Sequence, residues 1–454
     1  MQPTTSKATR PARGDELELS IDSLAFGGAG VGRLDGYVVF AQGGMPGDRV
    51  RVLVGKSKRA YAEARVVEIL EPSPDRIAPL ADHPGAPWQV LPYERQLEVK
   101  QAQVQDALKR IGRLEGYVLE PIVPALAQWR YRNKLEYSFG SDPNGRLVCG
   151  FHAAGRWDQI VECRDCMLAS EPANAARERV VGWCREQGLT PYDRRSGEGF
   201  LRNLVVREGR RTGQLQARLI TSAGELDADS LIEAAQPVDG LLHTRMLRAG
   251  ESTQGGETEL LAGSERLQEE LSGIALRISS EAFFQTNTEM AERLYGVALE
   301  YAQLRGFERV YDLYCGIGTI ALALAPRVAE VWGLEIVEPA IADAIANARR
   351  NEIDNAHFFA GDVRLALREL SEKAGRPDLL VVDPPRAGLS QKVVRRIIET
   401  APKRIVYVSC NPTTLAPNAA QLVEAGYQLE RVAPVDMFPQ TPHIECVAGF
   451  ARAA

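Results

Sequence analysis

The 454-residue sequence contains no long apolar run and no apolar leader. No stretch approaches the roughly 18 consecutive apolar residues that a membrane-spanning helix needs, so the sequence predicts no membrane partner. The first residues, MQPTTSKATRPARGD, lack the apolar centre of a signal peptide. We therefore expect residues 1–14 to form a flexible basic tail and the protein to be cytoplasmic.

Regular cysteine spacing and excess positive charge are also missing. The seven cysteines are odd in number and irregularly spaced, which argues against a secreted disulfide framework and predicts reduced thiols. The formal net charge of −6 is unlike the strongly basic balance of many nucleic-acid-binding domains. Basic clusters are usually solvated surfaces, so they do not by themselves establish RNA contact. Two exist: Arg51 with Lys56, Lys58 and Arg59, and Arg130, Arg132 and Lys134 interleaved with Trp129 and Tyr131.

The length of the chain predicts more than one domain, because 454 residues exceed one ordinary core. From Glu16 to about Leu70, five short alternating segments are separated by glycines. This pattern predicts a small OB-type β-barrel, a fold that often binds nucleic acids. The segment Glu71-Pro72-Ser73-Pro74 breaks the pattern, so we place the barrel domain at residues 15–74.

The middle of the chain is predicted to be rich in strands. Residues 94–112 first place apolar side chains at helical spacing and close at Gly112, and this helix is expected to pack on the catalytic domain. From about residue 128 to 280 most runs resemble strands, for example KLEYSFG, LRNLVVREG and GQLQARLIT. We therefore expect a β-rich central domain at residues 75–282.

After Phe284, short apolar strands alternate with helices, as in ERVYDLYCG, EVWGLEIV, LLVVDPP and RIVYVSCNP. Such alternation predicts an α/β domain with a parallel, doubly wound, Rossmann-like sheet, which we place at residues 283–454. Ligands bind such sheets beyond the carboxyl ends of the strands. The polar motifs described next all follow strand ends.

The first polar motif is the glycine-rich turn DLYCGIGT. Its two glycines allow the backbone to turn sharply and approach a ligand, and Glu335 after the next strand is placed to accept hydrogen bonds from ribose hydroxyls. Ala321 stands where a GxGxxG motif has its third glycine, which disfavours NAD. Asp362 follows a further strand, where it either accepts from the amine of adenine or caps the next helix.

Cys410 follows the strand-like run Arg404–Val408 and precedes Asn411 and Pro412. A free cysteine is more often a small buried apolar side chain, but this one lies in a polar strand-to-loop turn. It is favoured as a nucleophile over Cys315, whose neighbours indicate that it only lines the cofactor turn. A methyltransferase acting at C5 of uracil needs such a thiolate, because C5 takes a methyl group only after something adds to C6.

Two further strand ends supply carboxylates. The turn Asp383-Pro384-Pro385-Arg386 follows one strand, and the segment FPQTPHIECV places Glu445 directly before a closing strand. Glu445 is a candidate general base, although an isolated glutamate is usually a solvated surface residue. His443, one of five histidines, is the alternative base.

Several motifs in register resemble the RNA 5-methyluridine (uracil-C5) methyltransferases over almost the whole chain. The stretch from GGAGVGRLDG to ARVVEIL looks like a TRAM domain, the RNA-binding barrel of many members. YRNKLEYSFG looks like their central domain, and the catalytic signatures follow in order: EAFFQTN, DLYCGIGT, GLEIVEPAI, DPPRAGL, SCNPTTLAPNA and HIECVA. The resemblance implies a Rossmann-like class I methyltransferase domain behind an N-terminal TRAM barrel, of the bacterial 23S ribosomal RNA type.

Carried over by position, the resemblance also implies residue roles. Cys410 matches the nucleophile that adds to C6 of a flipped-out uridine, and Glu445 matches the base that removes the C5 proton. A loop uridine costs least to flip, so the implied target is an RNA loop or junction. Six residues match positions that contact S-adenosylmethionine or lie beside it: Gln285, Tyr314, Thr319, Glu335, Asp362 and Asp383.

One departure from the family pattern concerns metal. Many ribosomal members hold an iron–sulfur cluster on a CxxxxxCxxC motif and a distant cysteine, but the near positions here are Ile77, His83 and Ala86. Only Cys166 remains, with Cys163 nearby, and such a cluster is normally held by four cysteines. We therefore predict no iron–sulfur cluster and no metal ligands, and interpret Cys163 and Cys166 as a structural pair.

Other interpretations stay open. A 5-methylcytidine methyltransferase uses the same C6 addition, but its usual second cysteine is replaced here by Arg386. A non-catalytic RNA-binding protein is an alternative of another class, against which the intact Cys410, Glu445 and Asp383 argue. The TRAM-like barrel favours ribosomal over transfer RNA, whereas the missing cluster ligands weaken that choice and leave a tRNA uridine-54 enzyme as the alternative. We expect a monomer.

Overall fold

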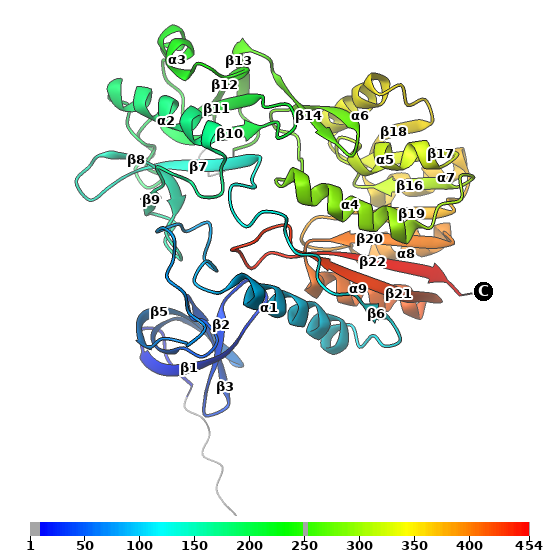
Figure 1. Ribbon diagram of the computed structural model, residues 1–454, viewed down its shortest axis with the longest axis horizontal. Coiled ribbons are helices and arrows are strands. Elements are labelled where there is room, and N and C mark those ends of the chain that lie inside the picture. The colour runs from blue at the N-terminus through cyan, green and yellow to red at the C-terminus, as the bar shows by residue number, and fades with distance from the viewer. Residues whose placement is uncertain (1–9, 248–252, 454) are drawn as a thin grey trace, which may run out of the picture.

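A computed structural model describes residues 10–247 and 253–453, so most of the predicted N-terminal tail lies outside the described residues (Figure 1). Five strands near the N-terminus form a closed barrel in the order β1-β2-β3-β5-β4. Alternate side chains of β4, among them Val50, Val52 and Val54, fill its interior. The predicted five-stranded barrel is confirmed. Its strands are β1 Glu16–Leu24, β2 Gly30–Leu34, β3 Tyr37–Gln42, β4 Arg49–Ser57 and β5 Tyr61–Glu71.

The central region contains a seven-stranded mixed sheet and a separate hairpin. The sheet runs in the order β13-β12-β11-β10-β7-β8-β9, and β14 pairs with β15. The sheet strands are β7 Lys134–Ser141, β8 Leu147–His152, β9 Ile160–Glu162, β10 Leu201–Glu208, β11 Leu215–Thr221, β12 Gly240–Arg245 and β13 Glu257–Gly263. The hairpin consists of β14 Arg266–Leu271 and β15 Ile274–Ser279. A β-rich middle region is therefore observed, as the sequence predicts.

Two helices cover one face of this sheet and were not among the predicted elements. Helix α2 spans Glu171–Glu186 and packs on β10 and β11, and the short helix α3, Ala228–Ala235, packs on α2. Ser170 begins α2 as its N-cap by accepting a hydrogen bond from the backbone of Ala173 at 3.2 Å. The sequence analysis predicted mostly strands for this region, so both helices are additions to it.

The C-terminal region forms a three-layer α/β unit. Its sheet runs in the order β18-β17-β16-β19-β20-β22-β21-β6, and β16 to β20 are mutually parallel. Strand β22 is antiparallel to both neighbours, so the sheet departs from the fully parallel expectation at this edge. The strands are β6 Val118–Leu119, β16 Arg309–Leu313, β17 Glu330–Glu335, β18 Ala356–Ala360, β19 Leu379–Val382, β20 Arg404–Ser409, β21 Tyr427–Val435 and β22 Glu445–Arg452.

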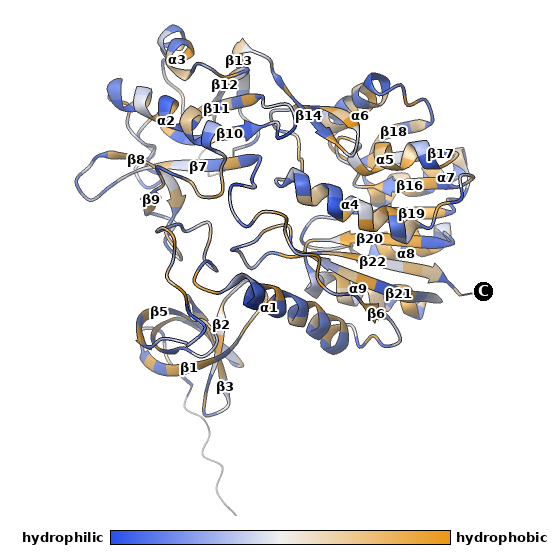
Figure 2. Cartoon of the chain, viewed as in Figure 1, coloured by the Kyte–Doolittle hydropathy of each residue, from blue (hydrophilic) through white to orange (hydrophobic). Residues whose placement is uncertain are grey.

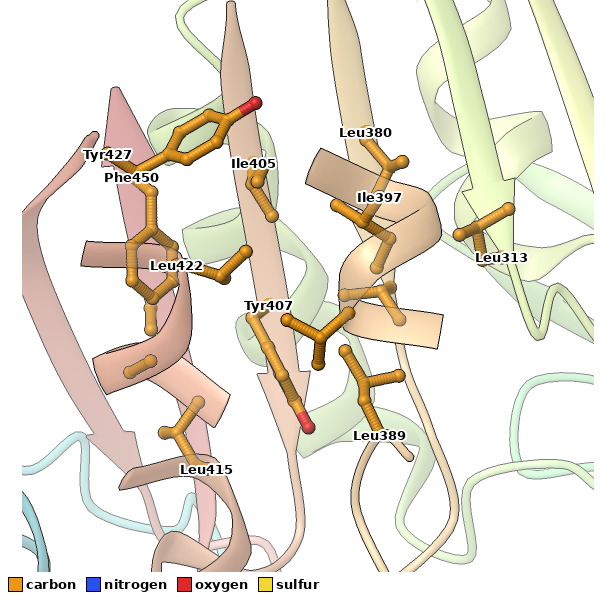
Figure 3. Close-up of a cluster of buried hydrophobic side chains, with 14 of the residues drawn as sticks. Leu313, Leu380, Leu389, Ile397, Ile405, Tyr407, Leu415, Leu422, Tyr427 and Phe450 are labelled. Atoms are coloured by element: carbon orange, nitrogen blue, oxygen red, sulfur yellow. The ribbon is translucent and has the colours of Figure 1, made fainter. Parts of the chain in front are cut away.

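Helices cover both faces of this sheet (Figure 1). One hydrophobic core lies under α4 Thr288–Ala302, α5 Thr319–Leu324 and α6 Glu338–Arg350. The other lies under α7 Val363–Ala374, α8 Gln391–Thr400 and α9 Pro412–Glu424. Figure 3 shows part of the second core, where Tyr407 lies among leucine and isoleucine side chains and its hydroxyl donates to Asn418 at 3.1 Å. In Figure 2, β20 and β22 are mostly apolar, as strands buried on both faces should be.

Helix α1, Tyr93–Asp106, continues into a π-helical turn, Ala107–Ile111, which ends before Gly112. This helix belongs to the sequence upstream of the central sheet, but it packs against α9 and β21 of the C-terminal unit. Val104 and Leu108 share the core of that unit. The division of the chain at residues 74 and 282 stays a proposal.

The barrel also touches the C-terminal unit through a tight turn between β1 and β2. Gly28 has a φ of 92°, and a Cβ added there would lie 2.9 Å from the side chain of Pro442 and 3.3 Å from the indole nitrogen of Trp88. Only glycine fits this turn without displacing a neighbour. Within residues 10–247 and 253–453, no helix is long and apolar enough to cross a membrane.

Candidate active site

The strand register brings the two predicted catalytic residues together. Strands β20 and β22 are antiparallel and pair Ser409 with Cys446, so Cys410 and Glu445 are the next residues opposite each other at the end of the ladder. Directly opposed residues on antiparallel strands have side chains on the same face, about 5 Å apart at Cβ. Strands β20 and β22, which are neighbours in the sheet but not in the sequence, therefore form the centre of the site.

Two further carboxylates lie at the same edge. Asp383 directly follows β19, whose last residue pairs with Leu313 of β16. Asp312, the residue before Leu313, is fully buried, and neither of its side-chain oxygens makes a hydrogen bond of ordinary geometry among the described residues. The backbone nitrogen of Ala321 lies near enough to oppose the rise in the pKa of Asp312. A buried carboxylate without a partner is costly to a fold, so Asp312 is a candidate for ligand contact that the sequence analysis missed. Its only sequence signal was its place at the start of DLYCGIGT.

The carboxylates make the site strongly acidic. Burial raises the pKa of Asp383 to about 7. Burial and then the charge of Asp383 raise the pKa values of Asp312 and Glu445 well above the ordinary carboxyl range. Each raised pKa means that the site disfavours the charged carboxylate when no cation is bound. The site is therefore suited to a positively charged ligand.

The same environment holds Cys410 as a thiol in this state. Burial, followed by the charges of Glu445 and Asp383, raises the pKa of Cys410 to about 12, and the cation of Arg386 opposes this rise. The amide nitrogen of Asn411 donates to the carbonyl oxygen of Arg386 at 3.0 Å, while the amide oxygen caps α9. Asn411 thus ties the cysteine loop to the loop that carries Asp383 and Arg386.

His443, the alternative base, lies close to this loop. Its Nδ1 is 3.5 Å from the guanidinium of Arg386. Burial, and then the cation of Arg386, lower the pKa of His443 to about 4. A group with so low a pKa holds a proton poorly at neutral pH, so this geometry favours Glu445 as the base.

The predicted cofactor turn has the open backbone that a close ligand requires. Tyr314, Gly316 and Gly318 have φ values of 65°, 54° and 85°, all in the left-handed region. A Cβ built on Gly316 would meet nothing within 4 Å, whereas one on Gly318 would lie 3.0 Å from Phe358. Gly316 therefore faces open space beside the carboxyl ends of the strands, and Gly318 is needed for packing.

The side chains of Glu335 and Asp362 already accept hydrogen bonds from backbone nitrogens. Glu335 accepts hydrogen bonds from the backbone nitrogens of Gly316 at 3.3 Å, Ile336 at 2.7 Å and Val337 at 3.0 Å. Asp362 caps α7 and pairs with Arg364, which lowers the pKa of Asp362. The helix-capping alternative for Asp362 is thus observed, and contact with adenine stays a prediction.

The last two predicted cofactor residues frame the turn from the α4 side. Thr319 begins α5, and its hydroxyl lies 3.3 Å from that of Tyr295 on α4. Gln285 is buried just before α4, and its backbone carbonyl accepts a hydrogen bond from Asn133 at 2.8 Å. Nothing in these contacts assigns a ligand to Gln285, whose role stays a prediction.

A buried ion pair anchors the loop that leads to Glu445, and sequence analysis missed it. Lys100 of α1 donates to Asp436 at 2.6 Å and to the carbonyl of Phe438 at 3.1 Å, and both charged side chains are fully buried. Tyr93 donates to the same carboxylate at 2.8 Å. Residues 336 positions apart give no local signal, so only the fold reveals the pair.

Residues of both predicted basic clusters make contacts within the protein. In the first, Arg51 bonds Glu18 and Glu68 across the barrel. In the second, Tyr131 is buried and donates to the carbonyl of Pro439 at 3.0 Å, so its ring is not available for base stacking. The first set of contacts lies within the barrel, the second links the central region to the C-terminal unit, and RNA binding by either cluster stays a hypothesis.

The fold and this site define a class I, Rossmann-like methyltransferase, and a solved structure agrees along the whole chain. The tRNA (uracil-54, C5)-methyltransferase of Pyrococcus abyssi, solved with S-adenosyl-L-homocysteine, is 29% identical, with a TM-score of 0.76. The match covers 96% of this chain and 100% of that one.

Family models and curated relatives make the assignment more specific. Residues 257–452 match the model of the tRNA (uracil-5-)-methyltransferases, and residues 11–67 match that of the TRAM domain. An uncharacterised RNA methyltransferase of Halalkalibacterium halodurans is 38% identical over 98% of both chains, and one of Bacillus cereus is 36% identical over 98% of this chain and 99% of its own. The chain belongs to the tRNA (uracil-5-)-methyltransferase family and is an S-adenosylmethionine-dependent RNA methyltransferase.

Proposed function

We propose that the protein methylates C5 of a uridine in ribosomal RNA, with Cys410 as the covalent nucleophile and Glu445 as the base. The observation that carries the proposal is the β20–β22 register, whose last pair is Ser409 with Cys446, so that Cys410 and Glu445 are the next residue on each strand. The charge of Glu445 also raises the pKa of Cys410, so the two groups lie near each other. The chain's family supports uracil C5 as the methylated atom. The remaining expectations, a monomer that acts in the cytoplasm, belong to this proposal.

The cofactor site fits S-adenosylmethionine on two observations of this structure. Within the described part of the chain the buried carboxylate of Asp312 has no hydrogen-bond partner, and a Cβ built on Gly316 would meet nothing within 4 Å. The cofactor carries an ammonium and a sulfonium group, so its positive charge suits a site in which Asp312 and Asp383 repel each other. We assign the cofactor to this edge, with contacts from residues of the glycine turn and the neighbouring strand ends: Gln285, Asp312, Tyr314, Thr319, Glu335, Asp362 and Asp383.

In the proposed reaction, the Cys410 thiolate adds to C6 of the flipped uracil, which makes C5 an enolate-type nucleophile. S-adenosylmethionine supplies the methyl group that C5 takes up. Glu445 then removes the proton from C5, and elimination breaks the sulfur–C6 bond to release Cys410 and restore the ring double bond. Arg386 lowers the pKa of Cys410 and of Glu445, and so favours both charged forms that these steps need.

The TRAM barrel supports an RNA substrate, and we propose ribosomal RNA as that substrate. Transfer RNA is the second candidate, favoured by the P. abyssi enzyme, which matches this chain along its full length and acts on a transfer RNA. Both substrates require the same extruded uridine, so the site chemistry does not distinguish them.

The test is to incubate the protein with radiolabelled S-adenosylmethionine and either unmodified large-subunit ribosomal RNA or unmodified transfer RNA. We expect 5-methyluridine from ribosomal RNA alone. Cys410→Ala should reduce the rate at least about 10⁴-fold while RNA binding and melting temperature stay unchanged. Cys184→Ala is the matched control, because Cys184 is a fully buried thiol of α2 away from the site and should leave the rate unchanged.

Label from transfer RNA alone would keep the chemistry and reverse the substrate. Label in 5-methylcytidine would overturn the uracil assignment. No label in either RNA, combined with tight RNA binding, would instead support the non-catalytic RNA-binding alternative.

A further inference from the structure

A cluster of three buried side chains lies outside the active site, at the junction of the barrel linker and the central sheet. His83, Cys163 and Cys166 present ligand atoms that all lie within 4.8 Å of one another. Nε2 of His83 is 3.2 Å from the sulfur of Cys166. The exposed fractions of the three residues are 4%, 4% and 0%, so the surrounding protein shields the cluster from bulk water.

We propose that His83, Cys163 and Cys166 bind one zinc ion, which fastens the segment between the barrel and α1 to the central sheet. Zinc prefers thiolate and imidazole ligands at about 2.3 and 2.0–2.1 Å in a tetrahedral arrangement. Ligand atoms in such a site lie about 3.5–4 Å from one another, which small side-chain adjustments reach from the present separations. Two soft thiolates with one imidazole also disfavour magnesium and calcium, which take oxygen ligands.

The donor set does not fit an iron–sulfur cluster. Such a cluster is held by four cysteine thiolates, and only two are present here. Of the other near motif positions, Ile77 and Ala86 carry no donor, and Ile77 is 48% exposed. The absence of a cluster stays a prediction, but the residues that remain suit a single ion better than four irons.

The loop that carries the two thiols is held in place without a metal. The amide of Asn174 on α2 accepts from the backbone nitrogen of Cys166 at 3.0 Å and donates to its carbonyl oxygen at 3.1 Å. The backbone nitrogen of Cys163 donates to the carbonyl of Cys149 at 3.2 Å. Preorganised ligands lose little freedom on binding, which favours affinity.

Three protein ligands leave a fourth tetrahedral position. The buried hydroxyl of Tyr137 lies beside the two thiols and near enough to interact with Cys166. Nδ1 of His83 is also buried without a partner among the described residues. A buried imidazole nitrogen without a partner, beside two thiols, indicates that the site is completed by something other than the chain.

The ion would connect parts of the chain that are far apart in sequence. His83 lies in the irregular segment between β5 and α1, whereas both cysteines follow β9. The segment before α1 also contacts the loop that leads to Glu445, because Trp88 donates to the carbonyl of Gln440 at 2.9 Å. A metal at this point would therefore hold the barrel linker in register with the catalytic unit.

The first test is elemental analysis of the full-length protein, purified from zinc-supplemented cells without chelators. We expect about one zinc ion per chain and no stoichiometric iron. Cys166→Ala should lose most of the zinc, and Cys184→Ala, which removes another buried thiol, should retain it. Removing zinc from the wild-type protein with a chelator should lower its melting temperature, and added zinc should restore it.

The wild-type measurement keeps the proposal testable even when a cysteine variant fails to fold, and His83→Gln provides a second ligand deletion. Zinc well below stoichiometry in the wild-type protein would overturn the proposal. Iron with acid-labile sulfide would overturn both this proposal and the prediction that a cluster is absent. A Cys163–Cys166 disulfide without metal, detected as a loss of two hydrogens by mass spectrometry, would overturn it as well.

Discussion

Asp436 and Asp312 are both fully buried, and they differ only in what surrounds their carboxylates. Asp436 is bonded by Lys100 at 2.6 Å, by Tyr93 at 2.8 Å and by the backbone nitrogen of Phe438 at 3.2 Å. Asp312 has no partner for either oxygen among the described residues. A buried carboxylate with all its partners completes the fold, whereas one without them costs stability until a ligand arrives.

The same difference distinguishes the structural role of Asp436 from the proposed ligand-binding role of Asp312. The Asp436 cluster holds the loop that leads to Glu445, and its partners come from α1. Asp312 lies near the carboxyl end of β16, at the edge of the sheet where the reaction is proposed to occur. Neutralising a carboxylate in each place should therefore have opposite effects on stability.

Removing the cation of the anchor should cause the largest change. Lys100→Met leaves Asp436 buried without its counterion, and breaking a buried pair in this way costs about 3–5 kcal/mol. We expect a lower melting temperature and reduced methyl transfer, because the loop carrying Glu445 loses its attachment.

The control is Lys373→Met, which removes the cation of an exposed pair with Glu369 on α7. Exposed pairs contribute about 0–1 kcal/mol, so this variant should melt close to the wild type. The double variant Lys100→Met with Asp436→Asn should recover part of the loss. Equal melting temperatures for Lys100→Met and Lys373→Met would remove the basis for calling the cluster an anchor.

The same substitution at the two aspartates should shift stability in opposite directions. Asp312→Asn removes an unpaired buried carboxyl and should stabilise the ligand-free protein by about 1–3 kcal/mol, while Asp436→Asn leaves Lys100 unpaired and destabilises it. Asp312→Asn should also weaken S-adenosylmethionine binding, measured by calorimetry, about tenfold or more. A destabilised Asp312→Asn variant would show that Asp312 is structural, as Asp436 is.

The acidic edge should make Cys410 sensitive to the charge of its neighbour. Bound S-adenosylmethionine carries a sulfonium cation that S-adenosylhomocysteine lacks. The pKa of Cys410 is about 12 in this structure, and it should be lower with S-adenosylmethionine bound than with S-adenosylhomocysteine bound. A fall of one unit gives about ten times more thiolate at neutral pH. We expect iodoacetamide to label the Cys410 peptide about tenfold faster with S-adenosylmethionine than with S-adenosylhomocysteine, as read by mass spectrometry. Equal rates would mean that the cofactor charge does not reach the thiol.

A pH dependence of stability should arise from Asp383. The folded pKa, about 7, is raised above the ordinary value of 3.8, so the folded protein holds this proton more tightly than the unfolded chain. Stability from this group is complete below pH 4 and is lost as the pH rises toward 7. The melting temperature of Asp383→Asn, minus that of the wild type, should therefore increase between pH 5 and about 7. A difference that is constant or falls over this range would contradict the assigned shift.

Local patterns in the sequence predicted much of the fold and several site residues. The alternation of strands 16–71 and the strand-helix order after Phe284 depend on nearby residues, so the barrel and the α/β unit were recognisable. Cys410 and Glu445 stand beside strand ends, which marks them without knowledge of the fold. Their direct opposition required the antiparallel β22, and the sequence suggested only parallel strands.

Contacts between distant residues were beyond sequence patterns. Lys100 and Asp436 are 336 residues apart, and His83 and Cys166 are 83 apart. Each side chain reads alone as an ordinary polar residue, and only tertiary packing makes it a buried partner. The state of Asp312 was equally hidden, because a missing hydrogen bond has no sequence signature.

The close approach of Gly28 to Pro442 limits how this enzyme can be re-engineered. Many two-domain proteins tolerate an exchanged or deleted accessory domain, since their linkers isolate one part from the other. Here the turn between β1 and β2 rests against the segment that precedes Glu445, with no room for even one methyl group. A transplanted barrel would have to reproduce that turn, so changing RNA preference by domain exchange requires redesigning the contact as well as the RNA-binding surface.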